Sequence, residues 1–145
     1  MDDLISAIAT AVGAGGIAVV RMSGRGALSV ARKMFSRKGE FRPNYMYAGE
    51  IDAGTFRDYG MCVYFRAPKS FTGEDVVEFH CHGGTEIARG ILKRTLELGA
   101  RLAERGEFTK RAYLNGKLSL SAAEGVGEMI AASSEAQGRA GYLLY

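Results

Sequence analysis

A carboxylate and two imidazoles alternate with apolar side chains along residues 76–82 (VVEFHCH). This alternation has the period of two that is typical of a β-strand with one buried face. The side chains expected to point into the core are Val77, Phe79 and Cys81. The side chains expected on the opposite face are Glu78, His80 and His82. Three kinds of chemistry are open to that polar face: metal binding, nucleophilic catalysis and recognition of a ligand.

The geometry of a strand argues against the first two. The two imidazoles would face one way and the Cys81 thiol the other, so one metal ion could not contact all three. Zinc also needs three or four converging ligands, and no paired cysteine or histidine occurs elsewhere in the chain. A Cys–His nucleophilic pair fails on the same geometry and has no third orienting group. We therefore expect no metal site and no catalytic residue.

The residues around this strand predict how it is held. Gly73 allows a sharp turn before it, and the carboxylates of Glu74 and Asp75 are expected to keep that loop hydrated. Gly83-Gly84 ends the strand, and Thr85 is the expected N-cap of a following helix. That helix would span residues 85–98 and stop at Gly99. Its apolar stripe consists of Ala88, Ile91, Leu92, Thr95 and Leu98.

The remaining chain predicts further short elements. Expected strands cover residues 4–10, 17–22, 45–51, 59–65 and an edge strand at 101–103. Expected helices open at Ser23-Gly24, cover 107–114 and begin again at the capping box of Ser121 and Glu124. The glycine-rich segment 11–16 precedes a β-branched run and not a helix, which argues against a phosphate-binding loop.

Length and composition fit one globular domain of 145 residues. Nineteen basic and sixteen acidic residues give a net charge of +3, which identifies no partner. Basic residues cluster in 32–42 and again in 101–117, where Arg111 lies; either cluster could be a solvated face or a phosphate or tRNA contact.

Cys62 and Cys81 are expected to be core residues in a reducing compartment. The apolar runs are too short to span a bilayer, so we expect a cytoplasmic chain with no membrane partner.

Three blocks of sequence carry a resemblance to a known family. They are residues 67–75 (APKSFTGED) continuing to 82–84 (HGG), residues 15–24 (GGIAVVRMSG) and residues 106–118 (GEFTKRAYLNGKL). These blocks resemble the N-terminal domain of the bacterial tRNA-modification GTPase family, MnmE or TrmE. The similarity runs over nearly all of the chain.

The resemblance implies an α/β fold, a small mixed sheet with helices against one face, similar to the tetrahydrofolate-binding fold of aminomethyltransferases. Residues 1–118 would form the folate-binding and dimerisation domain, and 119–145 the beginning of a helical domain. The implied ligand is 5-formyl-tetrahydrofolate, and the matching binding positions are Arg21, Glu78 and Lys117. The Glu78 carboxylate would accept the two-donor edge of the pterin, and Arg21 or Lys117 would meet the carboxylates of the folate tail.

Glu78 could equally be an ordinary glutamate on the surface of its strand. Because it lies on the polar face, we expect its replacement to leave folding almost unchanged. At the positions of Ala11-Val12 and Arg105 the family often has prolines. We therefore expect the loops near the pocket to be looser in this chain. This should affect the affinity for folate more than the fold.

The resemblance also implies partners. The domain would form a homodimer and work with a flavin-dependent tRNA-modification protein (MnmG/GidA-like) on the wobble uridine of tRNA. GTP, potassium and magnesium would bind to a GTPase domain that would lie beyond residue 145. The functional cysteine of the family belongs to a motif at its far C-terminus. We expect no GTP hydrolysis by these residues, and whether the chain is itself an enzyme stays open. Two alternatives are a stand-alone folate-dependent one-carbon transferase and a purely structural dimerisation module.

Overall fold

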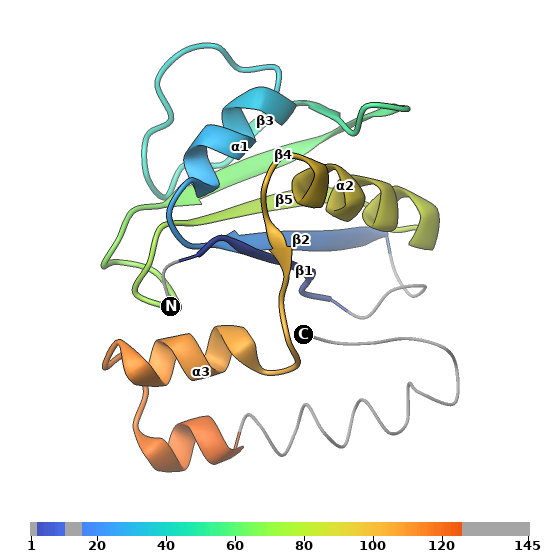
Figure 1. The fold of residues 1–145 in the computed structure, drawn as a ribbon. Coiled ribbons are helices and arrows are strands. Elements are labelled where there is room, and N and C mark those ends of the chain that lie inside the picture. Colours follow the sequence, from blue (N-terminus) through green and yellow to red (C-terminus); the bar gives the residue numbers. More distant parts are fainter. Residues whose placement is uncertain (1–2, 11–15, 126–145) are drawn as a thin grey trace.

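The computed structural model describes residues 3–10 and 16–125, which contain a six-stranded sheet and the helices that pack on it (Figure 1). The strand order is β3-β4-β5-β2-β1-β6. The strands are β1 (Ile5–Ile8), β2 (Ile17–Ser23), β3 (Tyr47–Asp52), β4 (Arg57–Phe65), β5 (Val76–His82) and β6 (Arg101–Leu102). The helices with described bounds are α1 (Ala27–Met34), α2 (Thr85–Glu97) and α3 (Glu107–Leu114).

The sheet is mixed, as the sequence predicts. All neighbouring strands run antiparallel except β1 and β6, which are parallel. β5 lies inside the sheet between β4 and β2, so the strand with the alternating pattern has a hydrogen-bonded neighbour on both sides. Its register with β2 places Glu78 directly opposite Arg21.

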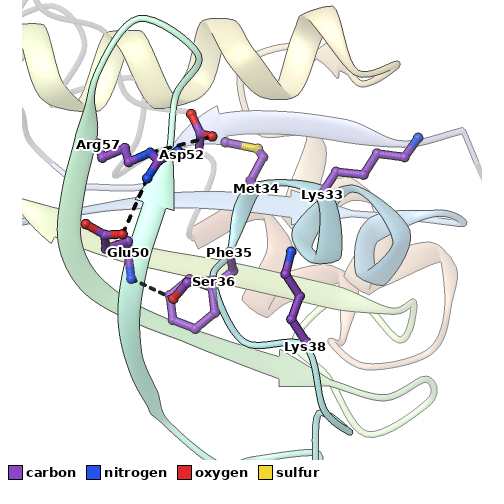
Figure 2. A pocket seen from close by; sticks show the side chains of 8 residues that line it. All are labelled: Lys33, Met34, Phe35, Ser36, Lys38, Glu50, Asp52 and Arg57. Carbon is purple, nitrogen blue, oxygen red and sulfur yellow. Dashed lines mark hydrogen bonds and ion pairs between the residues drawn. The ribbon is translucent and has the colours of Figure 1, made fainter.

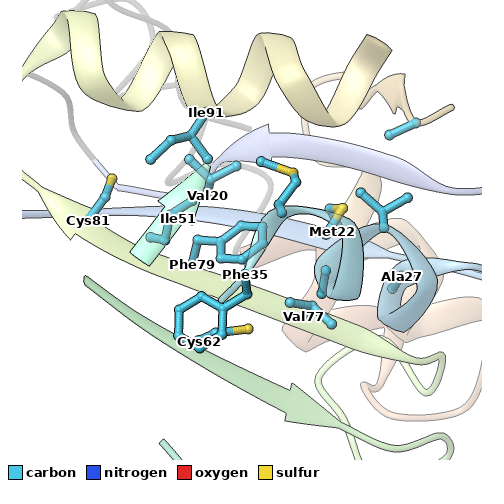
Figure 3. Packing of buried hydrophobic residues seen from close by; sticks show 14 of the residues in the cluster. Val20, Met22, Ala27, Phe35, Ile51, Cys62, Val77, Phe79, Cys81 and Ile91 are labelled. Carbon is cyan, nitrogen blue, oxygen red and sulfur yellow. The ribbon is translucent and has the colours of Figure 1, made fainter. Parts of the chain in front are cut away.

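One face of the sheet carries the main hydrophobic core, which α1 and α2 cover (Figure 1). Figure 3 shows Val77, Phe79 and Cys81 of β5 pointing into this core, as their alternation predicts. The apolar stripe expected on α2 also faces it, since Ile91 is almost fully buried, and Met34 of α1 is buried there as well. Burying a side chain of the size of Phe79 contributes about 3–5 kcal/mol, as judged by truncation to alanine.

The opposite face is covered only in part, by α3. The prediction that all helices lie against one face is therefore wrong: α3 lies across the sheet from α1 and α2 (Figure 1). The reason is that β1 is buried on both faces. Ile5 and Ala7 point away from the main core and form a second cluster with Ala103 and Phe108, the latter on α3.

Three predicted helix starts are shifted. The helix expected to open at Ser23-Gly24 begins at Ala27, with Gly26 at the N-cap position, because Ser23 is still the last residue of β2. Thr85 is the first residue of α2 and makes no capping hydrogen bond; the N-cap position belongs to Gly84. After α3 a further helical segment begins at residue 120, and Ser119 caps it, with its Oγ accepting the N–H of Ala122 over 3.1 Å. The predicted capping box at Ser121 is therefore wrong. The expected loop at 11–15 and the expected helix after residue 125 lie outside the described residues.

The end of α2 agrees with the sequence. Gly99 follows the helix with a φ of +117°, a conformation that favours glycine and ends the helix where the stripe stops. Across residues 3–10 and 16–125, none of the helices has both the length and the apolar character needed to cross a membrane.

Candidate functional site

The candidate site is built on the sheet face that α1 and α2 leave open. Arg21 of β2 and Glu78 of β5 occupy opposite positions there, and Arg21 Nε donates to Glu78 Oε2 over 2.9 Å. The side chains are 25% and 15% exposed, so the pair is neither sealed in the core nor fully in water. Two of the three residues predicted from the sequence are thus in direct contact.

His80 holds the other oxygen of the same carboxylate. It lies two positions along β5, on the same face, and its Nε2 is 3.0 Å from Glu78 Oε1. An ionised carboxylate only accepts hydrogen bonds, so this Nε2 carries the proton. The sequence places both residues on one face of the strand, but nothing in it specifies this contact.

The charge of Glu78 is set by these neighbours. Burial disfavours the ionised form and by itself would raise the pKa of Glu78. Hydrogen bonds from His80 and Arg21, with the positive charge of Arg21, outweigh burial and hold the pKa below its ordinary value of 4.5. At neutral pH the site therefore presents a fixed carboxylate.

Two phenylalanine rings flank the guanidinium of Arg21. Its central carbon is 5.8 Å from the centroid of Phe71 and 5.5 Å from that of Phe108. Contacts of this kind are favourable because the face of an aromatic ring attracts a cation. Phe71 is 44% exposed and Phe108 only 2%, so one ring borders the solvent and the other belongs to the second core cluster. Neither residue was predicted from the sequence.

Lys117, the third predicted residue, lies apart from this pair. Its ammonium donates to the carbonyl of Pro68 over 3.1 Å. Within the described part of the chain, the structure gives it no hydrogen bond or ion pair with Arg21 or Glu78. It is connected to them through the loop 66–75, which carries both Pro68 and Phe71 between β4 and β5.

The loop 66–75 is tightly held, and the prediction that its carboxylates keep it hydrated is wrong. The Glu74 side chain is only 13% exposed; its Oε1 accepts from Ser23 Oγ over 2.7 Å. Asp75 turns back on its own loop, and its Oδ1 accepts the N–H of Ala67 over 2.8 Å. Asn115, next to α3, donates to the carbonyl of Thr72 over 2.8 Å. The loop is thus held from β2 and from α3.

Arg111 does not belong to a solvated basic face. Its side chain is 1% exposed and makes ion pairs with Asp3, Glu74 and Glu107. Burial alone would lower the pKa of Arg111, but the carboxylates of Glu74 and Asp3 outweigh burial and hold the pKa above its ordinary value. Within the basic cluster 101–117, Arg111 is therefore a buried residue that forms ion pairs inside the protein.

A shallow depression of about 340 Å³ lies beside the pair on the open face. Its lining includes His80 and His82 together with Ile17, Tyr59 and Met61. His82 is held by the buried Asp58 of β4, whose Oδ1 is 2.7 Å from His82 Nδ1. Each imidazole thus has a carboxylate partner of its own.

A second pocket, of about 240 Å³, lies between the end of α1 and β3 (Figure 2). Figure 2 shows Lys33 and Lys38 at one side of it and the carboxylates of Glu50 and Asp52 at the other. Arg57 lies within 3.8 and 3.9 Å of those two carboxylates. Three basic side chains and two carboxylates lie together here, and this mixture of charges fits a solvated charged surface for this part of the cluster 32–42.

The cysteines are core residues, as predicted. Both are buried, and burial raises the pKa of Cys62 to about 12 and that of Cys81 to about 11. Neither thiol is therefore poised as a nucleophile at neutral pH. In residues 3–10 and 16–125, no group of three or more histidine, cysteine, aspartate or glutamate side chains could hold a metal ion.

Comparison with known proteins gives one consistent result. Residues 4–117 match the family described as the GTP-binding protein TrmE N-terminus. Curated relatives named tRNA modification GTPase MnmE include those of a Nitratiruptor species, 52% identical over 92% of this chain, and Aquifex aeolicus, 47% identical over 93%. The relative from Laribacter hongkongensis is 49% identical over 96%. The chain spans only 30%, 31% and 31% of the length of these three proteins.

Proposed function

This chain belongs to the TrmE N-terminal family, and on that premise we propose that it binds 5-formyl-tetrahydrofolate at the Arg21–Glu78 pair. Its relatives are named tRNA modification GTPases, so the bound one-carbon unit would serve the modification of the wobble uridine in tRNA.

The observation that carries the proposal is the state of Glu78. A reduced pterin presents an amino group beside a ring N–H, and a carboxylate can accept both in parallel. Glu78 is ionised, fixed by Arg21 and His80, and still 15% exposed. A carboxylate has about four lone-pair sites, and the two hydrogen bonds on its two oxygens leave others for a ligand.

The tail of the ligand requires cations. Arg21 uses only one of its five donors, Nε, on Glu78, and Lys117 uses one of its three on the Pro68 carbonyl. Both cations therefore have donors left for the tail carboxylates. The exposed ring of Phe71, on the loop 66–75 that also carries Pro68, offers an apolar surface to the part of folate between pterin and tail.

The open face also supports self-association. Ile17, Tyr59 and Met61 are 65%, 66% and 36% exposed on or beside the shallow depression. A second copy that covered them would form a homodimer, the commonest closed symmetry. The proposed partners beyond this are a flavin-dependent tRNA-modification protein of the MnmG/GidA kind and tRNA itself.

A calorimetric titration of the chain with 5-formyl-tetrahydrofolate tests the proposal. The matched control is Glu97→Gln, which changes an exposed glutamate of α2 paired only with Arg94 in the described part of the chain. We expect saturable binding by both the parent and the control. Absence of binding by the parent at several hundred micromolar ligand would leave the structural dimerisation module as the better explanation. Transfer of a formyl or methyl group by the chain alone would favour the stand-alone transferase.

A further inference from the structure

We propose that Arg111 is a positioning residue for the candidate folate site, holding the loop 66–75 and α3 so that Phe71 and Phe108 flank Arg21. This inference rests on the proposed function, because it concerns the same site.

Arg111 contacts the loop through Glu74. Its Nη1 donates to both oxygens of that carboxylate, over 3.0 and 3.2 Å. Glu74 in turn accepts from Ser23 Oγ, and Ser23 Oγ lies 2.7 Å from Thr72 Oγ1. Ser23 ends β2, two positions beyond Arg21 and on the same face of the sheet. The guanidinium thus connects the loop with the strand that carries Arg21.

Arg111 also contacts Asp3, which lies just before β1, and Glu107 in the first turn of its own helix. Its Nη2 donates to Asp3 Oδ1 over 2.6 Å and to Glu107 Oε2 over 3.3 Å. Its Nη1 donates to the carbonyl of Asp3 over 2.7 Å. A planar guanidinium can reach several acceptors at fixed angles, whereas a lysine ammonium acts as a single point. Arginine is therefore the side chain suited to this junction.

These two sets of contacts lead to the rings. Phe108 lies about one helical turn before Arg111 on α3, and Phe71 is carried by the loop that Arg111 holds through Glu74. Both rings contact Arg21, yet they come from elements far apart in the sequence. Arg111 belongs to the helix that carries Phe108 and is bonded through Glu74 to the loop that carries Phe71, so its loss should separate the two rings.

Arg101 provides a matched control within the same ion cluster. It pairs with Asp3 and Glu107, as Arg111 does, but the structure gives no hydrogen bond or ion pair between it and Glu74 in the described part of the chain. Arg101→Lys should lower stability without moving the loop. Arg111→Lys should move it.

The first measurement is the NMR signal of the Arg21 side-chain Nε–H, identified by its absence in Arg21→Lys. The rings of Phe71 and Phe108 change the chemical shift of this proton. We therefore expect the chemical shift to differ from that of the parent in Arg111→Lys and to be unchanged in Arg101→Lys. This measurement needs no folate, so it tests positioning even if the proposed function fails. An unmoved signal in a folded Arg111→Lys variant would overturn the proposal. If Arg111→Lys does not fold, Glu74→Gln weakens the same contact and is measured instead.

The second measurement is a double-mutant cycle in the affinity for 5-formyl-tetrahydrofolate. We expect Arg111→Lys and Phe71→Ala each to weaken binding about tenfold, the equivalent of one good hydrogen bond or ring contact. If Arg111 acts through Phe71, the double variant should bind about as weakly as either single variant. If the double variant bound about a hundredfold more weakly than the parent, the two effects would be independent and the proposal would be overturned. An Arg111→Lys variant that binds as tightly as the parent would overturn it as well. Absence of binding by the parent would instead refute the proposed function.

Discussion

Replacing Glu78 by glutamine should lower both the stability of the domain and its affinity for folate. The amide keeps one oxygen, so either the Arg21 Nε or the His80 Nε2 loses its carboxylate acceptor. The sequence alone predicted almost no effect on folding, because Glu78 lies on the polar face of its strand. The structure argues against that expectation, since the side chain is 15% exposed and is hydrogen-bonded on both oxygens.

The size of both effects follows from one lost charge-assisted hydrogen bond, about 1.5–3 kcal/mol. Low exposure limits solvent screening of the pair, so the free energy of unfolding at pH 7 should fall by an amount within that range. The same magnitude applied to the pterin contact weakens binding about ten- to a hundredfold. A variant that binds like the parent would show that Glu78 is structural and that the proposed site is wrong.

The pH dependence gives an independent check on the stability effect. The pKa of Glu78 is lowered by folding, so its contribution is present above the unfolded value of 4.5 and is lost as pH falls through the folded value. The difference in unfolding free energy between parent and Glu78→Gln should therefore be largest at neutral pH and shrink as pH falls below the unfolded value of 4.5. Urea denaturation at pH 7 and pH 3 measures it, with Glu97→Gln as the control. A difference that is the same at both pH values would contradict the assigned role of the charge.

Further expectations concern the rest of the chain. Lys117→Ala should weaken folate binding less than Glu78→Gln and lose its effect at high salt, because an exposed ammonium is screened; titrations at two ionic strengths decide this. Gly60→Ala should destabilise the fold by about 1–3 kcal/mol, since an added Cβ would clash with the His80 carbonyl oxygen, and thermal melts measure it. The chain should show no saturable GTP binding at micromolar concentration, because its sequence has no phosphate-binding motif. Light scattering at tens of micromolar should give the mass of a dimer; monomer mass alone would count against the proposed association.

Local patterns in the sequence were enough to predict most elements of the sheet. Strand alternation placed Val77 and Phe79 in the core, and the helical stripe ending before Gly99 placed the end of α2 to within about one residue. Helix starts were less accurate, because several polar residues near Ser119 could each serve as a cap. The side of the sheet on which α3 packs was missed, since it depends on the two-sided burial of β1 and not on any pattern in α3.

Arg21, Glu78 and Lys117 were expected because they match the binding positions of the resembled family. The contact between Arg21 and Glu78 was not predicted; it arises because the register of β2 and β5 pairs them. Phe71, Phe108 and Arg111 come from a loop and a helix whose positions depend on long-range contacts. No spacing in the sequence encodes those contacts, so a buried arginine in a basic segment had the appearance of a surface charge.

The way Glu78 is held bears on how a ligand would bind. A carboxylate that must become ordered and partly dry on binding loses affinity to those costs. Here Arg21 and His80 already fix its position and favour its charge, while its limited exposure means that much of its hydration is already gone. A ligand with two adjacent donors would therefore add hydrogen bonds to an ordered acceptor without displacing the existing ones. Loosening the loop that carries Phe71, or the helix that carries Phe108, should raise the cost of ordering Arg21, and the affinity should fall even though every contact atom is still present.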